Sequence, residues 1–237
     1  MVDSSLECWR MNPKDLTLRP LRSDVHYRGN FKENAWGLLT APAPLYRSML
    51  KHLGPFGGTL QSLKIDTASL ADANVSCTLP ELNAAIRIRL DRFEYDCWKL
   101  NEVGAEGAQR LLCAIWAAIH EADDSMELVT HIVDLNIVAE VAGGTSTELL
   151  RRYLQIPESL RDMDAGVALY TRPVKSESET WINLVLDRVF KEDNRILVKT
   201  TVGCAASEVQ IDGISQAAED QVTRVLDGLG LRLGTER

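Results

Sequence analysis

The feature that most constrains the fold is a change of hydrophobic period within residues 84–154. Residues 84–90 alternate apolar and charged side chains, so Ile86, Ile88 and Leu90 fall on one side of a strand. Across residues 108–119 the apolar residues recur every three or four positions instead, as in an amphipathic helix. A strand followed by such a helix predicts a fold in which the helix covers one face of a sheet.

A second strand is predicted at residues 128–139, which are apolar and β-branched on both faces and therefore suit the middle of a sheet. Thr145 and Glu148 have the spacing of a capping box, in which each side chain satisfies a free backbone amide. A short helix is predicted to follow and to end before Pro157, because proline cannot continue a helix.

Similar patterns predict further elements along the chain. The predicted strands cover residues 35–40, 59–65, 74–79, 166–171, 180–189 and 195–204. Helices are predicted from Pro44 to Leu53 and over residues 214–229, where Asp212 or Ser215 would cap the second helix. Consecutive strands without a helix between them favour antiparallel pairing. We therefore predict an α+β fold, with one or two largely antiparallel sheets and long amphipathic helices packed on one face.

The predicted organisation is one main domain with an extension before it. Residues 1–33 are polar and are predicted to form an N-terminal arm or an edge hairpin, and residues 34–237 a single domain. The predicted elements occur twice in the same order, with several strands before one long helix. This order predicts two similar halves, at residues 34–125 and 126–237, as an internal duplication would produce.

Composition narrows the classes of function. The chain has 26 basic and 34 acidic residues, a net charge of −8, which argues against broad nucleic-acid binding because that mode relies on neutralising phosphates. Its five cysteines are widely spread and never in CxxC spacing, which argues against a disulfide framework or a cysteine zinc site. With neither a signal-peptide pattern nor a long apolar run, the chain is predicted to be cytoplasmic.

The stretches that might carry catalysis lack the necessary partners. The glycine-rich loop at residues 54–58 has no following Lys-Ser or Lys-Thr, so it does not match a phosphate-binding P-loop. The acidic residues 121–127 lack the spacing and the glycine of a calcium loop, and the four histidines are scattered. The sequence nominates no catalytic residue, metal ligand or cofactor.

The best candidate ligand site is polar and lies on two strands. Arg87, Arg89 and Asp91 continue the charged side of the first strand, and Asp134 and Asn136 share one side of the second. Polar groups in an apolar strand line a wet pocket or accept hydrogen bonds from a neighbour. If both sets face the same way, they form a polar groove of mixed charge. The alternative is a solvated sheet face with weak ion pairs. His131 falls on the opposite side from Asp134, so these two residues do not form a local catalytic pair.

Two stretches resemble a sporadically distributed family of prokaryotic proteins of similar length whose function is unassigned. The first is residues 88–93, Ile-Arg-Leu-Asp-Arg-Phe, before the helix at 105–119, and the second is the strand at 128–137 with the short helix at 148–157. The resemblance covers about a third of the chain and departs from the family pattern in the second strand, at residues 131 and 133–136. It implies a similar α+β architecture and no known activity.

Two functions of different class fit these observations. The first is a cytosolic binding or interaction module without catalytic activity, acting as a homodimer or with a protein partner. The second is a small-molecule-binding protein or enzyme, with a pocket between the sheet and the C-terminal helix. A nucleic-acid partner is the least favoured at this net charge.

Overall fold

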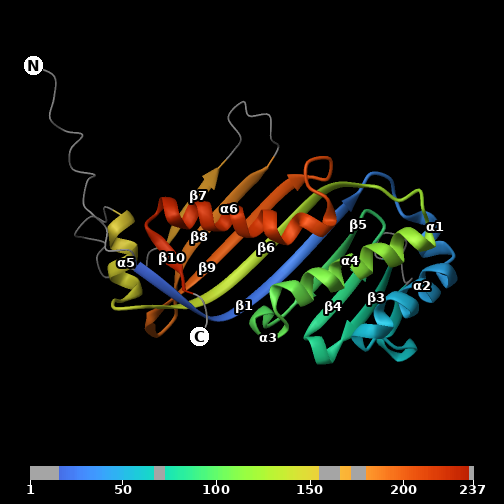
Figure 1. Ribbon diagram of the computed structural model, residues 1–237, viewed down its shortest axis with the longest axis horizontal. Helices are drawn as coiled ribbons and strands as arrows, with labels where there is room; N and C mark the ends of the chain where they lie inside the picture. The colour runs from blue at the N-terminus through green and yellow to red at the C-terminus, as the bar shows by residue number, and fades with distance from the viewer. Residues whose placement is uncertain (1–15, 67–72, 155–165, 172–179, 235–237) are drawn as a thin grey trace, which may run out of the picture.

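The computed structural model describes residues 16–66, 73–154, 166–171 and 180–234 (Figure 1). The strands are β1 (Leu16–Phe31), β2 (Leu63–Asp66), β3 (Asn74–Leu79), β4 (Ala84–Ile88), β5 (Arg92–Cys97), β6 (Leu128–Val141), β7 (Val167–Thr171), β8 (Trp181–Val189), β9 (Glu192–Ala205) and β10 (Leu231–Leu233). The helices are α1 (Trp36–Thr40), α2 (Ala43–Leu53), α3 (Leu100–Val103), α4 (Ala105–Ala122), α5 (Ser146–Tyr153) and α6 (Ile214–Gly228). Short 3-10 turns lie at Gly54–Phe56, Leu60–Ser62, Pro80–Leu82 and Ile211–Gly213.

All ten described strands belong to one sheet. Its order is β2-β3-β4-β5-β1-β6-β9-β8-β7, and each pair of neighbours is antiparallel. Strand β10 lies beside the start of β1 and runs parallel to it. The predicted α+β class with a largely antiparallel sheet is confirmed, and the strands form one sheet rather than two.

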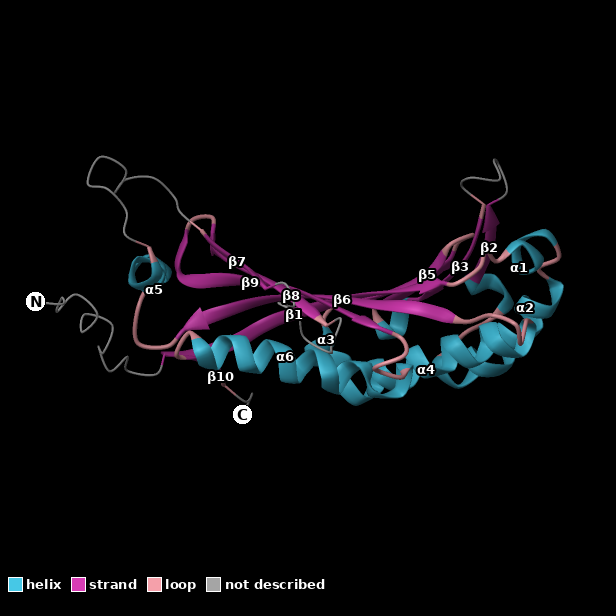
Figure 2. Ribbon diagram, turned by 90° about the horizontal axis from the view of Figure 1, so that it is seen from above, coloured by secondary structure: helices cyan, strands magenta, loops and turns pink. Residues whose placement is uncertain are grey.

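Helices cover one face of this sheet. Figure 2 shows α4 and α6 end to end beneath the strands, with no described helix above the middle of the sheet. The predicted apolar rows of both helices are buried, for example Leu111 and Ile115 in α4 and Val222 and Leu226 in α6. No helix in the described ranges is long and apolar enough to cross a membrane. The sheet thus has a covered face and an open face.

The chain passes through the same order of elements twice. A long strand, one or more short helices, a run of antiparallel strands and one long helix follow one another, first from β1 to α4 and then from β6 to α6. In the sheet, β1-β5-β4-β3 on one side mirrors β6-β9-β8-β7 on the other. The long strands β1 and β6 pair at the centre, so each half begins with its central strand.

The expectation of an N-terminal arm or edge hairpin is wrong for residues 16–31. These residues form β1, which pairs with β5 and β10 on one side and with β6 on the other. A register shift between Pro20 and Arg22 reverses the alternation, so Leu18 and Tyr27 both face the helices although one number is even and the other odd. This break in period divides the strand into two short stretches of alternation, residues 16–19 and 25–28, which are typical of an arm or a hairpin. Residues 1–15 lie outside the described ranges.

Two smaller expectations are also corrected. Residues 35–40 were expected to form a core strand, but residues 36–40 form α1, in which the adjacent residues Leu38 and Leu39 are both buried. A strand would point these two side chains in opposite directions. The expected cap of the last helix is also wrong, because Gly213 occupies that position without a side-chain hydrogen bond. The Ser215 hydroxyl instead donates to the side-chain oxygen of Gln109 on α4.

Several predicted elements are confirmed. Strand β6 lies at the centre of the sheet, between β1 and β9. The side chains of Thr145 and Glu148 form the predicted capping box at the start of α5, which ends at Tyr153. Pro157 lies outside the described ranges. The structure adds β5, which is absent from the elements expected above. Its polar side chains lie at the centre of the polar cluster on the open face.

Candidate functional site

The sequence-predicted site residues all belong to the open face, but they form two groups. Arg87 on β4, with Arg89 and Asp91 in the following turn, lies at one side of the sheet centre, and Asp134 and Asn136 lie on β6. Strands β5 and β1 separate β4 from β6. Three strand spacings amount to about 14 Å, so one small ligand does not bridge both groups.

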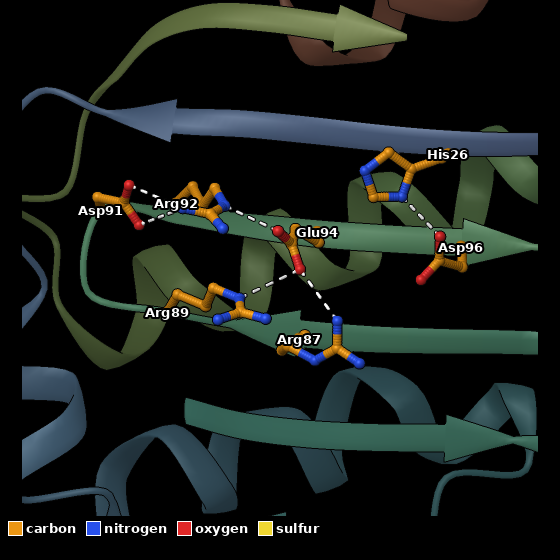
Figure 3. Close-up of polar contacts among 7 residues, drawn as sticks. All are labelled: His26, Arg87, Arg89, Asp91, Arg92, Glu94 and Asp96. Atoms are coloured by element: carbon orange, nitrogen blue, oxygen red, sulfur yellow. Dashed lines mark hydrogen bonds and ion pairs between the residues drawn. The ribbon is translucent and has the colours of Figure 1, made fainter. Parts of the chain in front are cut away.

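The first group is an arginine cluster around a buried carboxylate, Glu94 of β5 (Figure 3). Arg92 Nε donates to Glu94 Oε1 at 2.7 Å, and Arg87 Nη1 and Arg89 Nε donate to Glu94 Oε2 at 3.2 and 3.3 Å. Arg92 also contacts both oxygens of Asp91, at 2.8 and 2.9 Å. Two of the predicted residues, Arg87 and Arg89, therefore converge on Glu94, and a third, Asp91, joins the cluster through Arg92. The sequence analysis missed both Glu94 and Arg92.

The arginines keep Glu94 ionised. Burial opposes ionisation of the carboxyl, but the hydrogen bond from Arg92 and the charges of Arg89 and Arg92 outweigh it and hold the pKa of Glu94 below its ordinary value. Only 9% of the Glu94 side chain is exposed, against 43% for Arg87. A carboxylate held this way is an anchor that orders the guanidinium groups around it.

The second group, Asp134 and Asn136 of β6, lies beside His26 and Asp24 of β1. In the sheet register, His26 lies between Asp96 of β5 and Asp134 of β6. His26 Nδ1 bonds Asp96 Oδ1 at 2.6 Å, and this hydrogen bond raises the pKa of the imidazole. The Thr201 hydroxyl donates to Asp134 Oδ1 at 2.5 Å. Asn136 lies in register between Asp24 and Lys199.

The predicted charged residues of the open face thus already form hydrogen bonds with neighbouring side chains. Both predicted carboxylates, Asp91 and Asp134, already accept hydrogen bonds, and Arg87 and Arg89 already donate to Glu94. The missed residues Arg92, Glu94 and Asp96 sit at alternate positions of β5. Their alternation with Phe93 and Tyr95 is the signal that could have found them.

The covered face contains a cavity of about 490 Å³ between the middle of the sheet, α6 and the beginning of α4. Val25 and Tyr27 of β1, Val133 and Leu135 of β6 and Val202 of β9 form its floor. Val25 and Leu135 are only half-buried although they lie on central strands and face the helices. These side chains therefore meet unfilled space where a packed core would cover them.

Helix α6 forms the roof. Ile214, Ala218, Val222 and Leu226 recur every four residues, and all four line the cavity. The space remains open because α6 presents the small residue Ala218 there, and α4 presents small residues, including Ala108, at its own beginning. The roof is thus as apolar as the floor.

Two hydroxyl groups of the floor are already bonded. The Tyr27 hydroxyl bonds His131 Nδ1 at 2.7 Å, and the Thr200 hydroxyl donates to the Leu135 carbonyl at 3.4 Å. His131 is buried on the face opposite Asp134, as its position in the strand predicted, and burial lowers the pKa of its imidazole. The floor therefore offers mainly apolar surface to a ligand.

Within the described ranges, no group of three or more potential metal ligands lies close enough to hold an ion. Cys77, Cys97, Cys113 and Cys204 are free thiols, and Cys8 lies outside those ranges. No family model matches the chain, and no curated protein matches it. The resemblance to a prokaryotic family given above therefore stays a prediction.

Proposed function

We propose that this protein binds an apolar small molecule in the cavity between α6 and the sheet. The observation that carries the proposal is the half-burial of Val25 and Leu135 over a cavity of about 490 Å³. Ligand pockets commonly have volumes of about 300–1,000 Å³ and are lined mainly by apolar side chains. Filling this cavity with an apolar ligand would remove the exposed parts of both floor residues from water.

The proposed role is binding rather than catalysis. The Tyr27 and Thr200 hydroxyls are committed to protein partners. Besides Ser23 and Tyr95, the other described residues of the central strands that line the cavity are aliphatic. We place this function in the cytosol, because the widely spread cysteines do not suit a disulfide framework.

Mass spectrometry of the freshly purified protein, first native and then denaturing, tests the proposal. We expect extra mass in the native spectrum that is released as an apolar compound on denaturation. A neutral dye such as Nile red should bind the protein after the compound is removed.

The matched variants are Ala218→Trp, which fills the cavity, and Ala217→Trp on the neighbouring position, which does not line it. We expect Ala218→Trp to abolish dye binding and Ala217→Trp to retain it. Equal dye binding by the two folded variants would overturn the proposal.

A second candidate, the interaction module, is supported by the edge of the sheet at β7. In the described ranges β7 pairs only with β8, and its sequence Val-Ala-Leu-Tyr-Thr contains no charged residue. The opposite edge, β2, carries Lys64 and Asp66. Charged residues protect edge strands from pairing, so β7 is the less protected edge.

We propose a second copy of this chain as the partner at β7, since antiparallel pairing about Leu169 would set Ala168 of each copy against Tyr170 of the other. Tyr170 is 70% exposed. Light scattering should give twice the chain mass for the native protein and the single-chain mass for Tyr170→Lys. A native monomer would rule out this dimer.

A further inference from the structure

One rim of the cavity is a polar row on α6. Ser215, Glu219, Thr223 and Asp227 recur every four residues, directly beside the buried row that forms the roof, and all four line the cavity. Glu219, Thr223 and Asp227 are exposed. The boundary between the apolar and polar sides of the helix therefore runs along the opening of the cavity.

This rim carries two uncompensated negative charges. Glu219 and Asp227 are eight residues apart, which is about 12 Å along the helix axis. In the described part of the chain neither carboxylate makes a hydrogen bond or an ion pair with another side chain. Among the described residues that line the cavity, Arg232 is the only basic one, so this part of the lining has more negative than positive charge. The whole chain, at −8, adds to this negative potential.

The interior dictates where a ligand's charge must lie. Among the described residues, no charged side chain contributes to the floor or to the buried row of α6, so an ion placed there would lose its hydration without gaining an opposite charge. A charged group on the ligand must therefore stay at the rim, with the apolar body below it. At the rim it would meet the carboxylates of Glu219 and Asp227.

We infer that the cavity selects an apolar molecule with a cationic amine group over one with a carboxylate. This inference rests on the proposed function, because it names the class of molecule that the same cavity takes. An ammonium group at the rim is attracted by Glu219 and Asp227, whereas a carboxylate is repelled by them. An alcohol of the same length has neither interaction.

Three probes with the same apolar body test the inference: octylamine, octanol and octanoate. Their affinities are measured by displacement of Nile red at neutral pH, where an amine is protonated and a carboxylic acid ionised. We expect octylamine to bind about tenfold more tightly than octanoate, with octanol between them, since each exposed charge pair contributes only modestly. In about 1 M NaCl, where the screening length is about 3 Å, the difference should largely disappear.

The double variant Glu219→Gln/Asp227→Asn should bring the affinities of the three probes together. Asp220→Asn is the matched control, since Asp220 is an exposed neighbour on the same helix that does not line the cavity. This control should keep most of the preference for the amine. Circular dichroism confirms that each variant keeps its helices.

The outcomes separate the two proposals. If octanol and octanoate bind as tightly as octylamine, and Ala218→Trp abolishes all binding, the cavity binds ligands but the inference about charge is wrong. If no probe displaces the dye, or Ala218→Trp binds as the native protein does, the proposed function fails and the inference fails with it. If Asp220→Asn removes the preference as fully as the double variant, the rim assignment is wrong.

Discussion

On the open face of the sheet, charged side chains meet one another, whereas on the covered face the same strands present apolar side chains to a space that α4 and α6 leave unfilled. Neighbouring residues of β1 illustrate the contrast, because His26 bonds Asp96 on the open face and Tyr27 lines the cavity on the other. On the face richest in charge, the side chains around Glu94 and His26 already bond one another. The face with little charge retains room for a ligand, as the proposed function requires.

The largest effect is expected from breaking the arginine cluster of the open face. Glu94→Gln removes the charge that three arginines surround, and we expect a loss of about 3 kcal/mol in the free energy of unfolding, because one partner of a buried ion pair is removed. Urea denaturation measures it. The control Glu127→Gln affects an exposed pair with Lys32 and should leave stability unchanged. Equal results for the two variants would show that the cluster is only a solvated surface.

The same carboxylate predicts a pH dependence. Because the folded-state pKa of Glu94 is lowered, its contribution to stability is present above the unfolded-state pKa of about 4.5 and is lost as the pH falls through the folded-state pKa. The native protein should therefore lose more stability than Glu94→Gln when the pH falls below about 4.5. Urea denaturation at several pH values measures the free energy of unfolding of both proteins. An equal loss in the two proteins below pH 4.5 would contradict this prediction.

The next effect concerns a close contact on the open face, where the Trp181 ring of β8 lies on Gly203 of β9. A Cβ atom at Gly203 would overlap the Trp181 ring. We expect Gly203→Ala to reduce the free energy of unfolding by about 2 kcal/mol, as overpacking does. The loss should disappear in a Trp181→Ala background. Gly228→Ala is the control, since nothing lies within 4 Å of its added Cβ.

The covered face should respond in the opposite direction to added volume. Ala218→Leu places more apolar surface in the cavity, and we expect a gain of about 1 kcal/mol in the free energy of unfolding. Ala217→Leu, beside the cavity, should change it by less than about 0.5 kcal/mol. A destabilised Ala218→Leu protein would mean that the space under α6 is already filled.

The sequence was most informative where the period of the pattern was regular. Strand β6 and helix α4 were predictable because their alternation and their helical spacing run without interruption. Strand β1 was not, since the shift between Pro20 and Arg22 reverses its phase. Missing β1 and β5 meant that Asp134 and Arg87 were assigned to one groove, although two further strands lie between them.

The cavity was expected only in outline, as a pocket between the sheet and the last helix. Its extent depends on how α4 and α6 meet over the central strands, and that arrangement of distant elements leaves no local pattern in the sequence. The rim residues Glu219 and Asp227 looked like ordinary solvent-exposed positions of an amphipathic helix. Only the position of α6 over the sheet shows that they border a cavity.

The smallest expected effect distinguishes the two faces by their histidines. The pKa of His26 is raised by its hydrogen bond to Asp96, and that of His131 is lowered by burial, so NMR titration should find His26 above and His131 below 6.5. Asp96→Asn should lower only the pKa of His26. The contribution of the His26–Asp96 pair to the free energy of unfolding is present below pH 6.5 and is lost as the pH rises through the folded-state pKa of His26. Since both side chains are partly exposed, at 34% and 27%, the loss should be less than about 1 kcal/mol. A change in the pKa of both histidines in Asp96→Asn would mean that the two faces are electrostatically coupled through the sheet and do not act separately.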